Sequence, residues 1–261
     1  MIPALWIAKT GLDANQTSVS VTAHNLANVE TAGFKKGQGV FADTLYQKIR
    51  QPGAQSTATS ELPSGLMLGT GVKVIATQKD FAPGNLQRTN NAFDMAINGR
   101  GFFKITRSDG TTAYTRAGKF SPDSTGAIVN LEGNKLDPAL TVPPGALSFT
   151  VGNDGTVSVL VTGSTTPTTL GQIQLADFIN PAGLEPIGDN LFLETQASGT
   201  PQSGVPGNNG LGSLEQNNLE SSNVNIVEEM VNLIQHQRAY ETNARTIETA
   251  DDMMRFLVQT I

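Results

Sequence analysis

The chain of 261 residues contains no cysteine. Without a thiol there can be no disulfide framework, no thiolate metal site and no cysteine nucleophile. Histidine is scarce as well, with His24 and His236 near opposite ends of the chain. Neither histidine has a second histidine or a carboxylate at metal-ligand spacing, so the sequence predicts no metal centre.

Charged residues are also few, at 15% of the chain, and the balance is acidic, with a formal net charge of -6 and a pI near 4.9. An acidic surface repels phosphate groups, so we expect neither nucleic acid nor an anionic membrane surface as a partner. The apolar stretch at 1–8 is far too short to span a bilayer, and we expect no membrane insertion. It also lacks the basic start and the small-residue cleavage site of a secretory signal. The sequence therefore predicts a cytoplasmic protein, unless the chain leaves the cell by a route that cleaves nothing.

Motifs that carry catalysis are missing. The glycine pair at 99 and 101 lacks the third glycine of a dinucleotide fingerprint, because Lys104 takes its place. No serine lies in a nucleophile elbow. The adjacent carboxylates at 228–229 and 251–252 lie on helical segments, where neighbours point in different directions and suit a solvated face. We therefore expect no catalytic residue, no cofactor and no enzymatic activity.

Both ends of the chain carry an apolar residue at every seventh position. The N-terminal set is Leu5, Leu12, Val19 and Leu26, and the C-terminal set is Ile226, Leu233, Tyr240, Ile247, Met254 and Ile261. This spacing is typical of α-helical coiled coils. The C-terminal helix, capped by Ser222 or Asn223, would be about 50 Å long and would need a partner along its whole length. The ten residues are therefore predicted to form a coiled-coil assembly interface.

Gln237 and Asp251 occupy a companion position of the C-terminal repeat. Such polar residues either face water at the edge of the seam or, when buried, fix the register and the partner at a cost in stability. We favour the solvent-facing interpretation for Asp251, and both interpretations stay open for Gln237.

The middle of the chain shows a different pattern, with short alternating runs broken by turn residues. The runs at 147–151 and 157–161 flank a turn at 153–155, which is the pattern of a β-hairpin. A second hairpin is expected from 101–106 and 112–115. Most of the phenylalanines lie in this region, and we expect them in the core rather than in a binding site.

These patterns predict an α+β multidomain protein in which a discontinuous terminal coiled-coil domain flanks a mainly β middle domain. The terminal domain would comprise 1–32 with 222–261, and the β-rich domain 74–197. The intervening segments, 33–73 and 198–221, contain stretches rich in Gly, Pro, Ser, Thr or Asn. We expect them to form an extended connector region.

Three groups of residues form recognisable signatures. The first runs through Ala23, His24, Asn25, Leu26, Ala27, Asn28, Val29, Thr31, Gly33, Phe34 and Lys35. The second comprises Asp94, Ala96, Ile97, Gly99, Gly101, Phe102, Phe103, Tyr114, Thr115, Arg116, Gly118 and Phe120. The third comprises Ser222, Asn223, Val224, Asn225, Glu228, Met230, Ile234, Gln237, Arg238, Ala239, Tyr240, Glu241 and Asn243. Together they closely resemble the axial proteins of the bacterial flagellum, the family of rod, hook and hook-associated proteins.

The resemblance covers almost the whole chain. The stretch from 46 to 72 is similar to the distal-rod members, with the proximal rod proteins as the nearest alternative, and hook proteins usually carry larger middle domains. The family implies export by the flagellar type III apparatus without a cleaved signal peptide. It further implies assembly into a rigid hollow helical rod that crosses the periplasm in the basal body and transmits torque from motor to hook.

The partners that the family implies are other copies of the chain, proximal rod proteins, the hook protein, the P and L ring proteins, the rod cap and the export apparatus. The absence of cysteine fits this route, because an exported unfolded chain without cysteine cannot form wrong disulfides in an oxidising compartment. A trimeric secreted β binding module and a glycan-acting enzyme remain as competing classes. The first would be a stable soluble trimer, and the second would need a carboxylate pair that the sequence does not provide.

Overall fold

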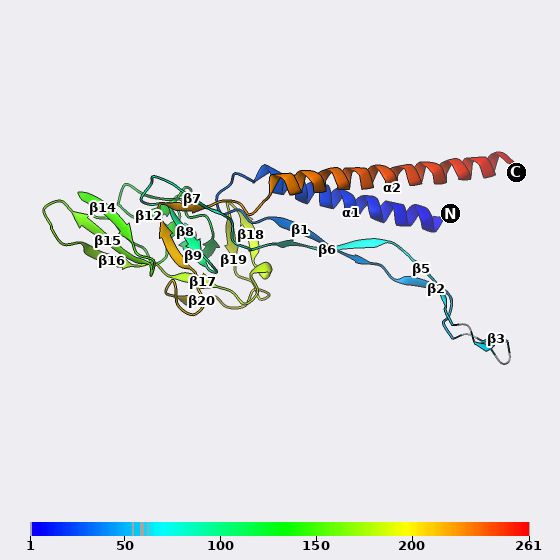
Figure 1. Cartoon of the computed structure of the whole chain (residues 1–261), viewed down its shortest axis with the longest axis horizontal. Coiled ribbons are helices and arrows are strands. Elements are labelled where there is room, and N and C mark those ends of the chain that lie inside the picture. The colour runs from blue at the N-terminus through cyan, green and yellow to red at the C-terminus, as the bar shows by residue number, and fades with distance from the viewer. Residues whose placement is uncertain (1, 54, 58–59, 62, 261) are drawn as a thin grey trace. The chain divides into compact units, whose positions relative to one another are not determined.

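The structure, a computed structural model, describes residues 2–53, 55–57, 60–61 and 63–260 (Figure 1). Helix α1 spans Ile2–Ala27 and helix α2 spans Ile226–Thr260, and strands occupy most of the chain between them. The predicted α+β class, with terminal helices flanking a mainly β middle, is confirmed at this level.

The chain forms two compact units. Unit 1 comprises Met1–Leu26, Gly37–Gln78 and Asn225–Ile261, and unit 2 comprises Ala27–Lys36 and Lys79–Val224. Both units are therefore discontinuous in sequence. The observed division differs from the predicted one, because the segment 33–73 is split between the two units and 198–221 lies entirely within unit 2.

The helices of unit 1 begin with residues that suit helix starts. Pro3 lies in the first turn of α1, where its missing N–H removes no helical hydrogen bond. At α2, the Asn225 side chain accepts a hydrogen bond from the Val227 N–H at 3.1 Å, and its carbonyl accepts one from the Glu229 N–H at 3.0 Å. Asn225 is therefore the cap, in place of the predicted Ser222 or Asn223. Neither helix, over its described residues, is apolar enough for long enough to cross a membrane.

The strands of unit 1 form a two-stranded ribbon. They are β1 (Gly37–Asp43), β2 (Tyr46–Arg50), β3 (Gln55–Thr57), β4 (Ser60–Glu61), β5 (Leu66–Gly69) and β6 (Val72–Lys79). β1 pairs with β6, β2 with β5, and β3 with β4. The sequence prediction of an extended connector gave no strands here. The residues of β2 and β5 are exposed on both faces, so they have no alternation of apolar and polar residues by which strands are recognised.

Unit 2 holds the remaining strands. The first group is β7 (Leu86–Arg88), β8 (Met95–Asn98), β9 (Phe102–Thr106), β10 (Thr112–Thr115), β11 (Phe120–Pro122), β12 (Ile128–Asn130), β13 (Lys135–Leu136), β14 (Ala146–Val151), β15 (Thr156–Val161) and β16 (Thr168–Gln172). The second group is β17 (Leu175–Asp177), β18 (Glu185–Gly188), β19 (Leu191–Leu193), β20 (Gln202–Gly204), β21 (Ser213–Gln216) and β22 (Asn218–Glu220), with a short 3-10 helix at Pro181–Gly183. The range 198–221, predicted as connector, thus contains three strands.

The largest sheet of unit 2 has nine strands. Its main path is β11-β12-β13-β9-β10-β19-β18, with β17 pairing to β9 and to β20. β14, β15 and β16 form a separate three-stranded sheet, and β8 and β7 pair with β21 and β22. The last two pairs join early strands of unit 2 to the segment that leads out towards α2. Local sequence patterns do not reveal such long-range pairing.

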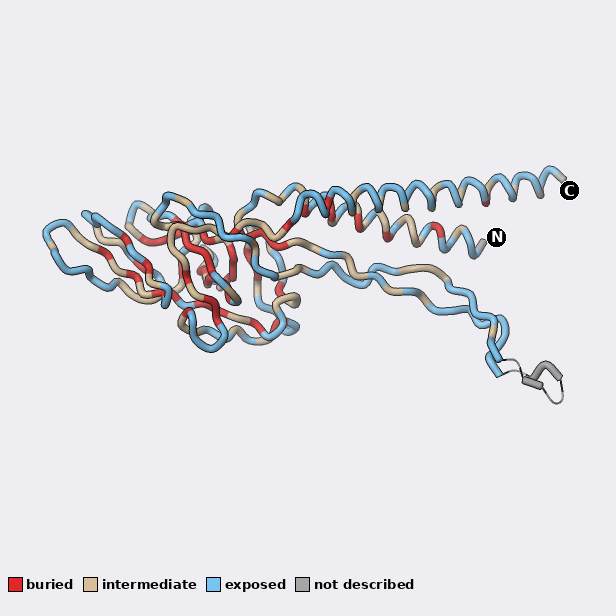
Figure 2. The backbone as a smooth tube through the Cα atoms, viewed as in Figure 1, coloured by how far each residue is buried: buried red, intermediate tan, exposed pale blue. Residues whose placement is uncertain are grey.

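Both predicted hairpins are confirmed. β9 pairs antiparallel with β10, with Ile105 opposite Ala113, and β14 pairs antiparallel with β15, with Phe149 opposite Val159. The phenylalanines are core residues as expected. Those buried in unit 2 are Phe34 and six residues of its β-rich part, Phe102, Phe103, Phe120, Phe149, Phe178 and Phe192. These six lie in two clusters, the larger of which includes residues of both the nine-stranded and the three-stranded sheet. Figure 2 shows the buried positions concentrated among the strands of unit 2.

Three turns of unit 2 are built in the same way. An aspartate carboxylate accepts hydrogen bonds from the backbone N–H and the hydroxyl of the threonine two residues later, at distances from 2.5 to 3.0 Å. The pairs are Asp109 with Thr111, Asp123 with Thr125 and Asp154 with Thr156. These hydrogen bonds stabilise the ionised carboxylate, so the pKa of each aspartate lies below its usual value.

The turns should make unit 2 acid-sensitive. Because folding lowers the three pKa values, their stabilisation is complete above the unfolded-state value of about 3.9 and is lost as pH falls through the folded-state values. The urea midpoint of unit 2, followed by near-UV circular dichroism, should therefore fall less between neutral and acidic pH in D109N/D123N/D154N than in the wild type. Equal acid sensitivity of the two proteins would contradict this account.

Candidate assembly site

Within unit 1, α1 and α2 lie side by side and run in opposite directions (Figure 1). Near the end of α1, the Asn25 Nδ2 donates a hydrogen bond to Glu229 Oε2 at 3.2 Å. Further along, Gly11 faces Asn243, and a Cβ added to Gly11 would lie 2.9 Å from Asn243 Nδ2. The two contacts are fourteen residues apart on each helix, from 25 to 11 and from 229 to 243. The helices therefore keep one antiparallel register over two heptads.

The buried positions of the helix pair, drawn red along α1 and α2 in Figure 2, carry small or polar side chains. On α1 they are Ala8, Ala14, Ser18, Thr22 and Asn25, and on α2 they are Glu229 and Ala250. Small side chains let two helix backbones approach closely. They also bury little apolar area, so this contact alone contributes little hydrophobic stabilisation.

The predicted heptad residues flank this contact rather than fill it. Leu5, Leu12, Val19, Leu26, Leu233, Ile247 and Met254 are half-buried, and Ile226 and Tyr240 are exposed. Ile261 lies outside the described residues. The α1 positions in contact with α2, 11 and 25, each lie one residue before a member of the predicted set, which is a rotation of about 100° around the helix. The role of the predicted set in assembly therefore stays a prediction.

Large apolar residues are also exposed on the helices. They are Trp6 and Ile7 on α1, and Val227, Met230, Val231, Ile234, Met253, Phe256 and Val258 on α2. Four of them, at 227, 230, 231 and 234, have the i, i+3, i+4, i+7 spacing of a single helix face. A contiguous exposed apolar surface of this kind marks an interaction site.

The ribbon of unit 1 exposes apolar side chains too. Leu45 is 88% exposed, and Tyr46, Ile49, Leu66, Met67, Leu68 and Ile75 are also exposed. At the bend between β1 and β2, the hydroxyls of Thr44 and Thr70 lie 2.6 Å apart, and Thr70 also donates to the Leu45 carbonyl at 2.6 Å. A two-stranded ribbon is marginally stable alone, so this element gains stability from any surface that covers it.

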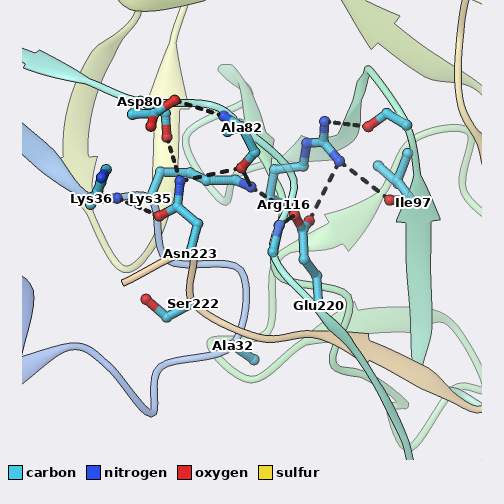
Figure 3. A network of polar contacts seen from close by, with 12 residues as sticks. Ala32, Lys35, Lys36, Asp80, Ala82, Ile97, Arg116, Glu220, Ser222 and Asn223 are labelled. Atoms are coloured by element: carbon cyan, nitrogen blue, oxygen red, sulfur yellow. Dashed lines mark hydrogen bonds and ion pairs between the residues drawn. The ribbon is translucent and has the colours of Figure 1, made fainter. Parts of the chain in front are cut away.

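Unit 2 contains a buried polar junction formed by Lys35, Arg116 and Glu220 (Figure 3). Lys35 Nζ lies 2.6 Å from Glu220 Oε1 and donates to the Ala82 carbonyl at 2.7 Å. Arg116 Nη1 lies 3.4 Å from Glu220 Oε2, and Nη2 donates to the Gly99 carbonyl at 2.7 Å. Burial lowers the pKa of Lys35 and of Arg116, and the Glu220 carboxylate opposes that effect on both. Two buried cations thus share a single carboxylate.

Hydrogen bonds of the Asn223 side chain and of the Gly33 backbone extend this junction towards points at which the chain passes out of unit 2. The Asn223 Oδ1 accepts a hydrogen bond from the Lys36 N–H at 2.8 Å, and its Nδ2 donates to the Asp80 carbonyl at 2.9 Å (Figure 3). The Gly33 N–H donates to the Glu220 carbonyl at 2.7 Å. Gly33 has a φ of +72°, and a Cβ there would lie 2.6 Å from the Ala117 nitrogen. Only glycine fits this position.

The structure brings some signature residues together and separates others. Within unit 2, Gly33 and Lys35 contact Glu220, and the Phe34 carbonyl accepts a hydrogen bond from the Asn223 N–H at 3.4 Å. Phe34 and Val224 are buried there. In unit 1, Asn25 is buried, Leu26 and Ala239 are half-buried, and Gln237, Arg238 and Tyr240 are exposed. In unit 2, Asn28 is half-buried and Ala27 is exposed. Exposed Gln237 agrees with a solvent-facing position in the single chain. Asp251 forms a surface ion pair with Arg255, with Oδ2 and Nη2 2.9 Å apart.

Sequence reasoning missed Glu220 and Glu229 as site residues. Both are at most 5% exposed, and each bonds a residue of the N-terminal signature. Their partners are far away in sequence, 185 residues for Lys35 and Glu220. The signal that was available is their position, since each lies within a few residues of the C-terminal signature residues 222–225.

Three stretches of the chain match known protein families. Residues 5–35 match the flagella basal body rod protein family, 96–159 match the flagellar hook protein FlgE/F/G D1 domain, and 215–260 match the flagellar basal body rod FlgEFG protein C-terminal region. The matched ranges include most of both helices and part of unit 2.

Full-length relatives point to the same family as these three matches. The flagellar basal-body rod protein FlgG of Buchnera aphidicola subsp. Schizaphis graminum is 49% identical, over 99% of this chain and 100% of its own length. FlgG of Borreliella burgdorferi is 46% identical over 97% of both chains, and FlgG of Bacillus subtilis is 36% identical over 99% of this chain and 98% of its own length. This chain therefore belongs to the FlgG family of flagellar basal-body rod proteins.

Proposed function

We infer that the chain is a structural subunit of the distal rod of the bacterial flagellum. The observation that carries this function is the similarity to FlgG proteins over essentially the full length of both chains. It assembles into the flagellar axial structure with other rod and hook proteins. These relatives are structural proteins, which gives the chain a mechanical rather than a catalytic role.

The mode of assembly follows from the helix surfaces. The contact between α1 and α2 is narrow and made of small or polar side chains, whereas the large apolar residues lie beside it or on the exposed faces. Neighbouring subunits would bury these residues in coiled-coil fashion, which gives each buried large side chain about 1.5 to 3 kcal/mol. The helices are thus completed by assembly, and copies of the chain form a rigid hollow helical shaft that transmits torque from motor to hook.

The site of action in this proposal is the rod where it crosses the periplasm. The chain reaches it through the flagellar type III apparatus without a cleaved signal peptide and assembles with the help of the rod cap. Its neighbours along the axis are the proximal rod proteins and the hook protein, and the P and L ring proteins surround it. No partner in this set is a nucleic acid or a lipid.

Self-assembly of the purified chain tests the proposal. We expect sedimentation to show growth beyond small oligomers as concentration rises, and negative-stain microscopy to show straight hollow filaments. A discrete soluble trimer at all concentrations would contradict the proposal and favour a trimeric binding module. A monomer that never polymerises, even when seeded with isolated rods, would contradict it as well.

A further inference from the structure

Asn25 and Glu229 form a buried polar pair between the two helices of unit 1, where the other buried side chains described are small. Asn25 is 2% exposed and Glu229 is 5% exposed. Glu229 also lies in the first turn of α2, where the helix dipole favours a negative charge. A buried polar pair costs free energy to desolvate, so its stabilising effect is smaller than that of an apolar pair of the same size. Its presence calls for an explanation other than stability.

Asn25 uses its whole amide group. Its Nδ2 donates to Glu229 Oε2 at 3.2 Å and to the Gly37 carbonyl at 2.9 Å, and its Oδ1 accepts from the Gly37 N–H at 2.7 Å. The side chain therefore pairs with Gly37 as a neighbouring strand residue would, at the first residue of β1. Because Gly37 is only twelve residues further along the same chain, the amide is tied to its own subunit.

The remaining layers of the contact do not define a register. In the observed pairing, 25 faces 229 and 11 faces 243, which places 18 opposite 236. Gly11 and Ser18 are both small, and a Cβ at position 11 would meet the terminal amide of Asn243. A slip by one heptad, which places Ser18 opposite Asn243, therefore displaces the end of a flexible side chain. The same slip would leave Asn25 and Glu229 without each other. Leaving these groups unpaired is unfavourable, because each loses its hydration on burial and gains no hydrogen-bond partner in return.

The large apolar residues beside the contact do not fix the register of α1 against α2 either. Leu, Ile, Val and Met side chains pack against many neighbours with similar energies, and the proposed filament surrounds each α1 with α2 helices of other copies. A polar pair at a single heptad position is the best-attested device for selecting register and partner in coiled coils.

We propose that Asn25 and Glu229 are the specificity-determining residues of the helix pair. They fix the register of α1 against α2, and they make α1 pair with α2 of its own chain rather than with that of a neighbouring subunit. This inference rests on the proposed self-assembly, because the choice between own and neighbouring helices arises only among crowded copies. Gln237 was one candidate for a buried polar residue that fixes the register. In this proposal that role belongs to Glu229 in the first turn of α2 and Asn25 near the end of α1.

The absence of cysteine permits a direct test by crosslinking. The variant G11C/N243C reports the observed register, because these positions are in contact, and S18C/N243C reports a slip of one heptad. Assembled chains of two sizes, one carrying a tag, are mixed and oxidised, and non-reducing electrophoresis separates links within a chain from links between chains. In the otherwise unchanged protein we expect G11C/N243C to link within a chain and S18C/N243C to link poorly.

Replacing the polar pair by N25L/E229L should keep the helices but lose the selection. We expect the ratio of in-register, within-chain links to all other links to fall about tenfold, which corresponds to about 1.4 kcal/mol of lost discrimination. E229L alone, which keeps both bonds between Asn25 and Gly37, should give an intermediate ratio. E229Q, whose Oε1 still accepts from Asn25, should retain the original ratio.

The control is Q16L/Q235L, which adds two leucines at exposed positions of the same helices. It should leave the crosslinking ratio unchanged. If E229L and N25L/E229L assemble and keep the original ratio, the register proposal is overturned and the proposed function stands. If the otherwise unchanged protein forms no polymer at all, the proposed function fails, whatever the crosslinks of the free chain show. Circular dichroism at 222 nm identifies a variant whose helices are lost, and loss in E229L and E229Q alike would also overturn the proposal.

Discussion

Replacing Glu220 by glutamine is expected to lower the free energy of unfolding of unit 2 by about 3 to 5 kcal/mol. Domains of this size have a total stability of about 5 to 15 kcal/mol, so the variant should lie close to unfolding at 37 °C. The effect is large because Glu220 is the carboxylate that both Lys35 and Arg116 contact, and all three side chains are at most 3% exposed.

The geometry of Glu220 explains why a neutral side chain cannot substitute. One carboxylate oxygen accepts from Lys35 and from the Gly84 N–H at 2.8 Å, and the other faces Arg116. Glutamine replaces one of these acceptors with a donor and removes the negative charge. Two cations would then remain buried with no opposite charge in the junction, and the Arg116 Nε already lacks a hydrogen-bond partner among the described residues. Uncompensated buried charge is among the largest penalties a substitution can cause.

Urea unfolding followed by near-UV circular dichroism measures this effect. The buried phenylalanines and Tyr114 report on unit 2, whereas the single tryptophan, Trp6, lies in unit 1 and reports separately by fluorescence. Glu215→Gln is a matched control, because Glu215 accepts hydrogen bonds from Asn98 and Asn218 near the surface and should cost about 1 kcal/mol. Equal unfolding midpoints for E220Q and E215Q would show that the buried junction contributes no more to the free energy of unfolding than a surface hydrogen bond does.

The sequence predicted the locally encoded elements well. The hairpin of β14 and β15 follows from alternating Phe149, Val151, Val157 and Val159 around a turn at 153–155, and each of these four residues is buried. The helix at 226–260 follows from its periodicity. In both cases, the residues that define the element are close together in the sequence, so a short window of sequence shows the pattern.

Three features could not be predicted, each for a different physical reason. The ribbon of unit 1 has two exposed faces and therefore no alternating pattern. The helix contact is rotated from the predicted apolar stripe because small and polar residues, rather than leucines, face the partner helix. Lys35, Arg116 and Glu220 are of types that are almost never buried unless paired, so a reader of the sequence places them on the surface until the partner is known.

A substitution in the apolar seven-residue repeat that the sequence identified is expected to affect polymerisation more than the stability of the single chain. Replacing Ile247 by aspartate should abolish polymerisation while unit 2 stays folded. Ile247 is only half-buried in the single chain, so the monomer loses part of one contact. In the filament, the neighbouring subunit would cover the exposed part, and a carboxylate in that position would have to be buried without a partner.

The surrounding charge makes this substitution more severe. Three carboxylates, Glu248, Asp251 and Asp252, already lie within five residues of Ile247, against one cation, Arg245, and Asp251 pairs with the more distant Arg255. A fourth carboxylate therefore meets repulsion rather than compensation. We expect the critical concentration for polymerisation to rise by about a hundredfold or more, equivalent to about 2.7 kcal/mol per subunit.

A pelleting assay over a range of concentrations, with negative-stain microscopy, measures the critical concentration directly. Ile247→Val should polymerise normally, since it keeps an apolar side chain, and Thr249→Asp adds the same charge at an exposed position two residues away. If T249D polymerises and I247D does not, the position rather than the charge decides, and the half-buried stripe is the surface that neighbours complete. If I247D forms straight filaments at the wild-type concentration, the seven-residue repeat has no part in assembly, and the interface must be sought on the exposed stripe at 227–234 or on the ribbon.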